Sequence, residues 1–232
     1  TPTTTNAAKV GNTEYATIDE AIAAWTNGTT LTLLSDVTLT DVITMKSTEH
    51  HILNLGTYTM TAATSKHAIQ ITCNDRSSAS YALTINADAT NPGGITATGK
   101  SCIYYSKTTS TKDRPIILIN NGVFTGSYSL NLTSNGNTNC PQAWINGGTF
   151  NLSEGTNVEL MGGSVYDSGP SKGMLFYIPM EVENATLYAH DFSANVSSGA
   201  GWDCLIGAYG GDVTVENAVI SDRSAGSIFR QG

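Results

Sequence analysis

A six-residue pattern that recurs along the chain constrains the fold more than any other feature of the sequence. It reads apolar residue, any residue, Asn or Gly, Gly or Ala, any residue, apolar residue. Asn and Gly adopt positive φ most readily, so each copy predicts a sharp bend between two strands. The five copies occupy 119–124, 145–150, 160–165, 182–187 and 215–220, and the bend residues are Asn121, Gly147, Gly162, Asn184 and Asn217.

The spacing of the copies indicates how much chain separates one bend from the next. Their first residues are 26, 15, 22 and 33 residues apart. An average in the twenties fits a coil with three short strands in each turn, whose equivalent strands stack into parallel sheets about 4.8 Å apart. Composition agrees, because only 13% of the residues are charged and 23 are Gly. Such a composition excludes a helix bundle and favours strands and turns.

One segment near the N-terminus, 15–27, predicts a helix. Four apolar residues recur at helical spacing on one face, and these are Ile18, Ala21, Ile22 and Trp25. Thr17 and Glu20 form a capping-box sequence, and the Asn-Gly pair at 27–28 predicts the end of the helix. Residues 30–39 then alternate between polar and apolar, which predicts a strand.

The segment from Lys9 to Ile22, followed by the strand at 30–39, resembles the opening of secreted surface proteins of gut bacteria in the pectate-lyase-like superfamily. The resemblance implies an all-β fold, namely a single-stranded right-handed parallel β-helix, which is a solenoid, with the short helix capping its N-terminal end. The organisation that follows is a flexible Thr-rich leader at 1–8, a capping segment with the helix at 9–29 and the parallel β-helix at 30–232.

The resemblance carries over no catalytic residue. Pectate lyases of this superfamily use Arg or Lys beside clustered carboxylates, and no basic residue of this chain falls in a recurring strand next to an acidic cluster. The Asn-Thr-Asp, Asp-Asp and Gly-His-Gly sequences of polygalacturonase-type hydrolases are absent. We therefore predict no catalytic residue, and the superfamily by itself does not fix a function.

Aligning the five copies predicts two columns of outward-facing residues, because alternate residues of a strand point to opposite faces. One column is Leu118, Trp144, Glu159, Glu181 and Thr214, and the other is Asn120, Asn146, Met161, Glu183 and Glu216. Glu159 with Glu181, and Glu183 with Glu216, would then lie on adjacent turns. Neighbouring carboxylates raise one pKa or recruit a cation, so these pairs are candidates for a calcium site or an acid and base pair. The alternative is a solvated acidic face.

Two tryptophans are the candidates for ligand binding through an aromatic ring. Trp144 falls in an outward column, and Trp202 lies in the Gly-rich stretch 198–203. Sugars stack on exposed aromatic rings, so both residues predict contact with a glycan. The alternative is that the rings pack under loops onto the body of the protein.

Cysteines and histidines give no sign of a metal site. The four cysteines form no Cys-x-x-Cys pair, which excludes a zinc ribbon, and they are Cys73, Cys102, Cys140 and Cys204. We predict free thiols, with a Cys73–Cys102 disulfide between adjacent turns as the alternative. The histidines lack metal-ligand spacing, and His50 and His51 are predicted in a solvated loop. No cofactor is therefore expected, with calcium as the one alternative.

The charge distribution bounds the partners and the location. The net charge is −8 without a run of Lys or Arg, which excludes nucleic acid. No apolar stretch approaches the roughly 20 residues of a membrane span. Low charge and the Thr-rich start favour a secreted or cell-surface protein, with any lipid anchor upstream of residue 1. The strand-like sequence at 227–229 is followed by no helix or loop that would cover it, which predicts either an oligomer contact there or a swapped tail or loop that folds over it.

These observations predict a non-catalytic bacterial module at the cell surface that binds glycans or a surface glycoprotein in the manner of an adhesin. The first alternative is a polysaccharide lyase or glycoside hydrolase that uses the outward carboxylates. The second is a structural spacer. A groove lined by carboxylates and aromatic rings would favour the enzyme, whereas a flat sheet face would favour binding or structure.

Overall fold

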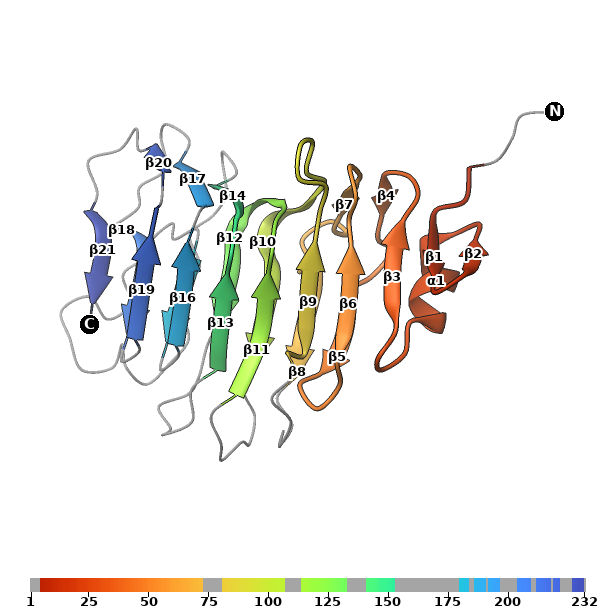
Figure 1. Ribbon diagram of the computed structural model, residues 1–232, viewed down its shortest axis with the longest axis horizontal. Coiled ribbons are helices and arrows are strands. Elements are labelled where there is room, and N and C mark those ends of the chain that lie inside the picture. The colour runs from red at the N-terminus through yellow and green to blue at the C-terminus, as the bar shows by residue number, and fades with distance from the viewer. Residues whose placement is uncertain are drawn as a thin grey trace.

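The described part of the protein consists of one helix and two β-sheets. The computed structural model describes residues 5–72, 81–106, 114–132, 141–152, 180–183, 186–190, 192–196, 204–209, 212–217, 219–221 and 227–231. The two sheets have nine and twelve strands and run beside each other along the long axis of the molecule (Figure 1). We call them sheet A and sheet B.

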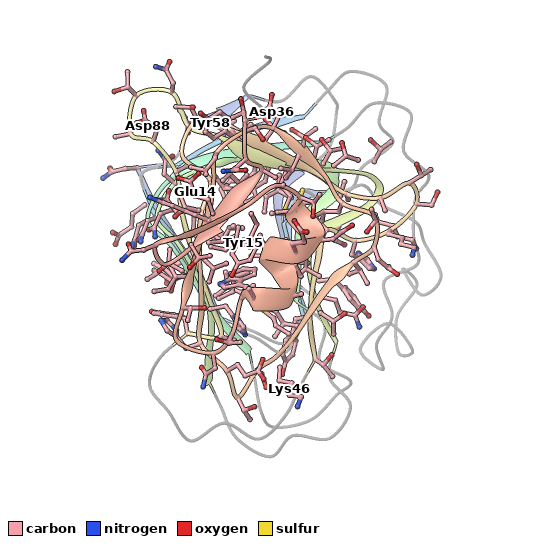
Figure 2. The ribbon with its side chains drawn as sticks, turned by 90° about the vertical axis from the view of Figure 1, so that its right-hand side faces the viewer. Glu14, Tyr15, Asp36, Lys46, Tyr58 and Asp88 are labelled. Atoms are coloured by element: carbon pink, nitrogen blue, oxygen red, sulfur yellow. The ribbon has the colours of Figure 1, made fainter. Side chains whose placement is uncertain are left out.

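The predicted helix is confirmed, although it is shorter than its apolar pattern. Helix α1 (Ile18–Ala24) begins after Thr17, whose hydroxyl accepts a hydrogen bond from the Glu20 N–H, while the Glu20 carboxylate accepts one from the Thr17 N–H. This is the expected capping box. Ile18 and Ala21 are buried. Figure 2 shows α1 lying across the N-terminal end of the space that the sheets enclose.

Sheet A is a mixed sheet. Strand β1 (Ala8–Val10) pairs antiparallel with both β2 (Thr13–Tyr15) and β3 (Thr30–Leu33). All later pairs are parallel, so that each strand lies beside one from a distant part of the chain. These strands are β6 (His51–Asn54), β9 (Leu83–Asn86), β11 (Arg114–Ile119), β13 (Pro141–Ile145), β16 (Thr186–His190) and β19 (Asp212–Glu216).

Sheet B is entirely parallel and strongly curled. Its long strands β10 (Gly94–Ser106) and β12 (Val123–Leu132) each span the curl. The first part of β10 pairs with β7 (Thr59–Thr61) and its last part pairs with β8 (Ile69–Thr72). Its pairing with β12 has a register shift between Ala97 and Ser101. The other strands of sheet B are β4 (Val37–Thr38), β5 (Ile43–Lys46), β7 (Thr59–Thr61), β8 (Ile69–Thr72), β14 (Gly148–Leu152), β15 (Met180–Glu183), β17 (Phe192–Val196), β18 (Cys204–Tyr209), β20 (Val219–Ser221) and β21 (Ser227–Gln231).

The prediction of a right-handed parallel β-helix, a solenoid of repeating turns, is therefore wrong. Repeating turns would separate three equivalent short strands by bends, but the strands here range from 2 to 13 residues. Sheet A opens with antiparallel pairs, and sheet B continues through its curl as a half-barrel. The physical reason lies in β10, where an irregularity in the ladder bends the strand without ending it.

A hydrophobic core fills the space between the sheets. Sheet A contributes Leu53 and Leu83, and sheet B contributes Met60 and Phe124, all fully buried. The Phe124 ring stacks on Phe150 with 5.2 Å between ring centroids. Along the sheet A strands buried residues alternate with half-exposed ones, which is the pattern expected of a sheet with one face on a core and one on solvent.

The bend residues are only partly as predicted. Asn217 has φ of 49°, as its place in the pattern predicts. In the copies at 119–124 and 145–150, positive φ falls one position later, at Gly122 (141°) and Gly148 (122°) instead of Asn121 and Gly147. Gly162 and Asn184 lie outside the described residues. The predicted strand at 227–229 is β21, which pairs with β18 at an edge of sheet B.

Candidate functional site

Two surfaces of the described residues have the features of a binding site, and neither resembles a metal centre. No group of three or more His, Cys, Asp or Glu side chains in the described ranges could hold a metal ion. The first surface is the solvent side of sheet A, and the second is a hydroxyl-lined cleft of sheet B. We describe their geometry in turn.

The solvent side of sheet A carries two parallel columns of uncharged side chains. In the first column, Ile52 lies opposite Thr84, which lies opposite Leu118, and all three are half-buried. The second column, two residues further along each strand, consists of asparagines. We call these seven residues the sheet A face, and they are Ile52, Asn54, Thr84, Asn86, Leu118, Asn120 and Asn146.

The asparagines form a ladder of side-chain amides. Asn120 Nδ2 donates to Asn86 Oδ1 at 2.8 Å, and Asn146 Nδ2 donates to Asn120 Oδ1 at 2.8 Å. At one end of the ladder, Asn54 Oδ1 accepts a hydrogen bond from the Gly56 N–H at 3.1 Å. A side-chain amide has two N–H donors and an oxygen with two lone pairs, so Asn120 can still bind a further partner after both ladder bonds.

The sequence predicted part of these columns. Leu118 with Trp144, and Asn120 with Asn146, were expected in two outward columns, and the register of β11 with β13 confirms that each pair is adjacent. Asn54 and Asn86 were missed. The sequence feature that could have identified them is an apolar residue followed by Asn at the end of each strand. It occurs at 53–54 and 85–86 as well as at 119–120 and 145–146.

Trp144 extends the first column by register. It lies opposite Leu118 on one side and Tyr188 on the other, and Tyr188 lies opposite Thr214. The structure describes the backbone of Trp144 but not its side chain. Trp202, the other predicted ligand-binding aromatic residue, lies outside the described residues, as does Glu159.

The expected pairing of Glu183 with Glu216 is wrong. Glu183 ends β15 in sheet B and lies opposite Tyr209, whereas Glu216 ends β19 in sheet A, where it is exposed and lies opposite His190. The pattern copy at 182–187 begins in β15 and ends in β16, so it does not align with the bends after β11 and β13. Glu181 lies opposite Asn131 and Gly207, and neither is acidic.

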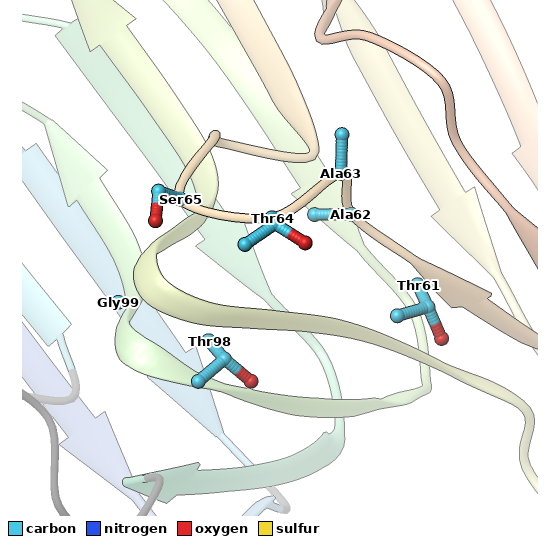
Figure 3. A pocket seen from close by; sticks show the side chains of 7 residues that line it. All are labelled: Thr61, Ala62, Ala63, Thr64, Ser65, Thr98 and Gly99. Carbon is cyan, nitrogen blue, oxygen red and sulfur yellow. The ribbon is translucent and has the colours of Figure 1, made fainter.

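The second surface is a cleft between the turn that follows β7 and the middle of β10. Its volume is about 420 Å³, and we call it the threonine cleft. Figure 3 shows Thr64 and Ser65 on the turn and Thr98 and Gly99 on β10. Every lining residue carries a hydroxyl, a methyl group or no side chain at all, and the lining residues are Thr61, Ala62, Ala63, Thr64, Ser65, Thr98 and Gly99.

The cleft lies beside a threonine column that the sequence analysis missed. Thr38, Thr61, Thr96 and Thr125 lie opposite one another on four neighbouring strands of sheet B. The signal in the sequence is the repeated Thr-x-Thr at 38–40, 59–61 and 96–98. Threonine is common in strands for its β-branched shape alone, so this repeat does not stand out without the register.

An exposed ion pair lies next to the cleft. Lys66, which follows Ser65, donates from Nζ to Asp41 Oδ1 at 2.6 Å, and both side chains are exposed. The hydrogen bond from Lys66 lowers the pKa of the Asp41 carboxyl. The pair links the turn after β7 to the segment before β5.

The prediction of a solvated loop is wrong for His51, the first residue of β6, which is only 5% exposed. Its Nε2 lies 3.1 Å from Glu49 Oε2, and its ring meets the edge of the Trp25 ring at 5.1 Å between centroids. The hydrogen bond from His51 lowers the pKa of Glu49. This group holds the end of α1 against sheet A. The Glu49 carboxylate gives Nε2 of the buried ring a partner, whereas Nδ1 is buried without a hydrogen-bond partner.

Cys102 is a buried free thiol, as predicted, which excludes a disulfide with Cys73. Its Sγ lies 3.3 Å from the carbonyl oxygens of both Ile95 and Thr125, and its single S–H can donate to either one. Burial raises the pKa of the thiol to about 12, so Cys102 is not a nucleophile near neutral pH. Cys73 and Cys140 lie outside the described residues, and Cys204 begins β18.

Comparisons with protein-family models, with curated proteins and with solved structures gave no match. The resemblance of the opening segment to surface proteins of gut bacteria therefore stays a prediction. In the described residues, no helix is long and apolar enough to cross a membrane.

Proposed function

We propose that this chain is a non-catalytic module that binds glycans through the sheet A face. The observation that carries the proposal is the side-by-side arrangement of a half-buried column, which holds the apolar residues Ile52 and Leu118, and an amide ladder, both uncharged. The predicted ligand residue Trp144 continues the apolar column by register.

A sugar ring has an apolar C–H face and a rim of hydroxyls. Ile52 and Leu118 offer apolar contact for the C–H face, and the amide of Asn120 offers a donor and an acceptor to the hydroxyls. Neighbouring strands are about 4.8 Å apart, which is close to the length of one sugar unit in an extended chain. A glycan lying across the strands would therefore meet an asparagine at each of these strands, beside Ile52 on β6, Thr84 on β9 and Leu118 on β11.

The lyase or hydrolase alternative has less support. Acid–base catalysis needs a titratable group within hydrogen-bond reach of the reacting atoms. None of the seven residues of the sheet A face is acidic or basic, and none of the seven lining residues of the threonine cleft is. By register, His190 and Glu216 continue the second column beyond Asn146, and they are the titratable groups that the hydrolase alternative would use. The proposal also makes the module extracellular, at a bacterial surface, with a polysaccharide or a surface glycoprotein as its partner, because low charge and Thr-rich strands suit that setting.

The test is retention of the protein on insoluble cellulose, chitin, β-1,3-glucan and mannan. We expect retention on at least one of them without the release of new reducing ends. Leu118→Ser and Asn120→Ala should each reduce that retention several-fold. Thr44→Ala, an exposed residue of β5 in sheet B, is the matched control and should leave retention unchanged. Circular dichroism of each variant verifies that the fold is retained.

Two results would overturn the proposal. The first is the absence of retention of the parent protein on all four polysaccharides. The second is retention that Leu118→Ser and Asn120→Ala reduce no more than Thr44→Ala does. Release of reducing ends would instead support the hydrolase alternative.

A further inference from the structure

We propose that the threonine cleft is a second binding site, which takes one unit of a neutral sugar. It lies in sheet B, apart from the sheet A face, and its argument does not depend on glycan binding there. The proposal is carried by the size of the cleft, the chemistry of its lining, its fixed walls and the absence of charge.

The lining offers matching chemistry for a polyhydroxylated ring. Thr61, Thr64, Ser65 and Thr98 supply four hydroxyls, each of which can donate one hydrogen bond and accept two. Sugar hydroxyls have the same dual capacity, so either partner can adapt its direction of donation. The methyl group of Ala63, with those of the threonines, offers apolar contact for the C–H face of the ring, whereas the Ala62 side chain is buried in the core.

The cleft is large enough for a small ligand and open where one would enter. Its volume of about 420 Å³ lies near the lower end of the roughly 300–1,000 Å³ typical of small-molecule sites. At Gly99, a Cβ atom built on the backbone would have no atom within 4 Å. That part of the wall is therefore empty space.

The walls of the cleft are held in place without a ligand. The turn is fixed by hydrogen bonds from the Ala62 N–H to the Thr96 carbonyl at 2.8 Å and from the Lys66 N–H to the Ala63 carbonyl at 3.0 Å. Ser65 has φ of 58°, an unfavourable conformation for a residue other than Gly. Backbone strain of this kind is found where surrounding structure fixes a functional site, and a prearranged wall reduces the entropy lost on binding.

The charge around the cleft favours a neutral ligand. None of the seven lining residues is charged. Of the two lysines that follow lining residues, Lys66 is paired with Asp41, and Lys100 also has an interaction of its own. A uronate or a phosphate would have to compete with Asp41 for the ammonium group, whereas a neutral sugar needs no counter-charge.

The test follows the methyl groups of ¹³C-labelled Ala and Thr by NMR during titration with glucose, galactose, mannose and cellobiose, with galacturonate as the acidic probe. We expect a saturable shift of the Ala63 methyl with at least one neutral sugar. Thr98→Val removes one hydroxyl at nearly constant shape and should weaken binding about threefold to tenfold. Thr38→Val makes the same change at an exposed position outside the cleft and should leave the affinity unchanged.

A second variant keeps the test decisive if the result of Thr98→Val is ambiguous. Ala63→Phe fills the cleft and should abolish the shift of the remaining lining methyls. The proposal is overturned if no neutral sugar gives a saturable shift, if only galacturonate binds, or if Thr98→Val behaves like Thr38→Val. Leu118→Ser separates the two sites, since it should reduce retention on polysaccharide and leave the titration of the cleft intact. Loss of cleft binding in that variant would overturn the independence of the site.

Discussion

A very close backbone approach in sheet B gives a sharp prediction at Gly94. A Cβ atom built at Gly94 would lie 2.2 Å from the carbonyl oxygen of Val123, the residue opposite it on β12. Cβ atoms essentially never lie within 3.0 Å of another heavy atom, so Gly94→Ala forces the two strands apart by about 0.8 Å. The Gly94 N–H donates to the Tyr58 carbonyl and the Val123 N–H donates to the Gly93 carbonyl, each at 3.0 Å, so neither strand can move without losing a bond.

The obstacle is a backbone atom, which cannot move aside as the end of a flexible side chain can. Gly94→Ala should therefore lower the free energy of unfolding by about 3 kcal/mol or more, the upper end of the usual range for overpacking. For a chain of this length that corresponds to a fall in Tm of at least about 6 °C. Gly99, in the same strand, is the matched control. It has φ of 80° but no atom near its Cβ position, so Gly99→Ala should cost only about 1–2 kcal/mol through backbone strain.

Substitution by Asn distinguishes the steric clash at Gly94 from the backbone strain at Gly99. Asn tolerates positive φ better than Ala does, so Gly99→Asn should recover stability relative to Gly99→Ala, whereas Gly94→Asn should be at least as destabilising as Gly94→Ala. The measurement is urea unfolding followed by circular dichroism. The reasoning is refuted if Gly94→Ala costs no more than Gly99→Ala, or if Asn rescues both positions.

Three further predictions concern the core and two titratable groups. Phe124→Ala should lower the free energy of unfolding in urea by about 3–5 kcal/mol, and a double-mutant cycle with Phe150 should give a coupling of about 0.5–1.5 kcal/mol. With the other three cysteines replaced by serine, Cys102 should resist a thiol reagent at pH 8 until denaturant is added, since its pKa is about 12. The lowered pKa of Glu49 gives stability above about pH 4.5 that is lost as pH falls through the folded value, so Glu49→Gln should flatten that part of the unfolding profile.

A specific result would contradict each of these three predictions. A zero coupling in the Phe124 and Phe150 cycle would mean that the stacked rings stabilise the core only by their separate burial. Rapid modification of Cys102 in the native protein would contradict its burial. An unchanged acid profile in Glu49→Gln would show that the contact with His51 contributes nothing to stability as the pH falls.

The predictions that held came from local features. The capping box at Thr17 and Glu20 fixes the start of α1 because its hydrogen bonds join residues three apart. The alternation of apolar and polar residues fixes which side of a strand faces the core, as for Leu83, Thr84, Ile85 and Asn86 in β9. The outward positions of Asn120 and Asn146 follow from the same two-residue period.

The predictions that failed depended on distant pairing. The pattern at 182–187 matched the bends at 119–124 and 145–150 in residue type, yet it spans the end of β15 and the start of β16. Every residue has a backbone carbonyl and every residue except Pro has an N–H donor, so a bend-like sequence does not determine which parallel strand it joins. The supposed pair of Glu183 and Glu216 therefore belongs to two different sheets.

The sequence by itself determined the helix, the strand character of the chain and the face that each strand turns to solvent, because these depend on residues within a few positions of one another. Only the tertiary structure decided that β10 runs unbroken through the curl of sheet B and that the turn at 62–66 meets Thr98 and Gly99 to form a cleft. It also decided that four asparagines align by register, three of them joined by side-chain hydrogen bonds. These features join residues some thirty positions apart, and their register is set by the packing of the whole core.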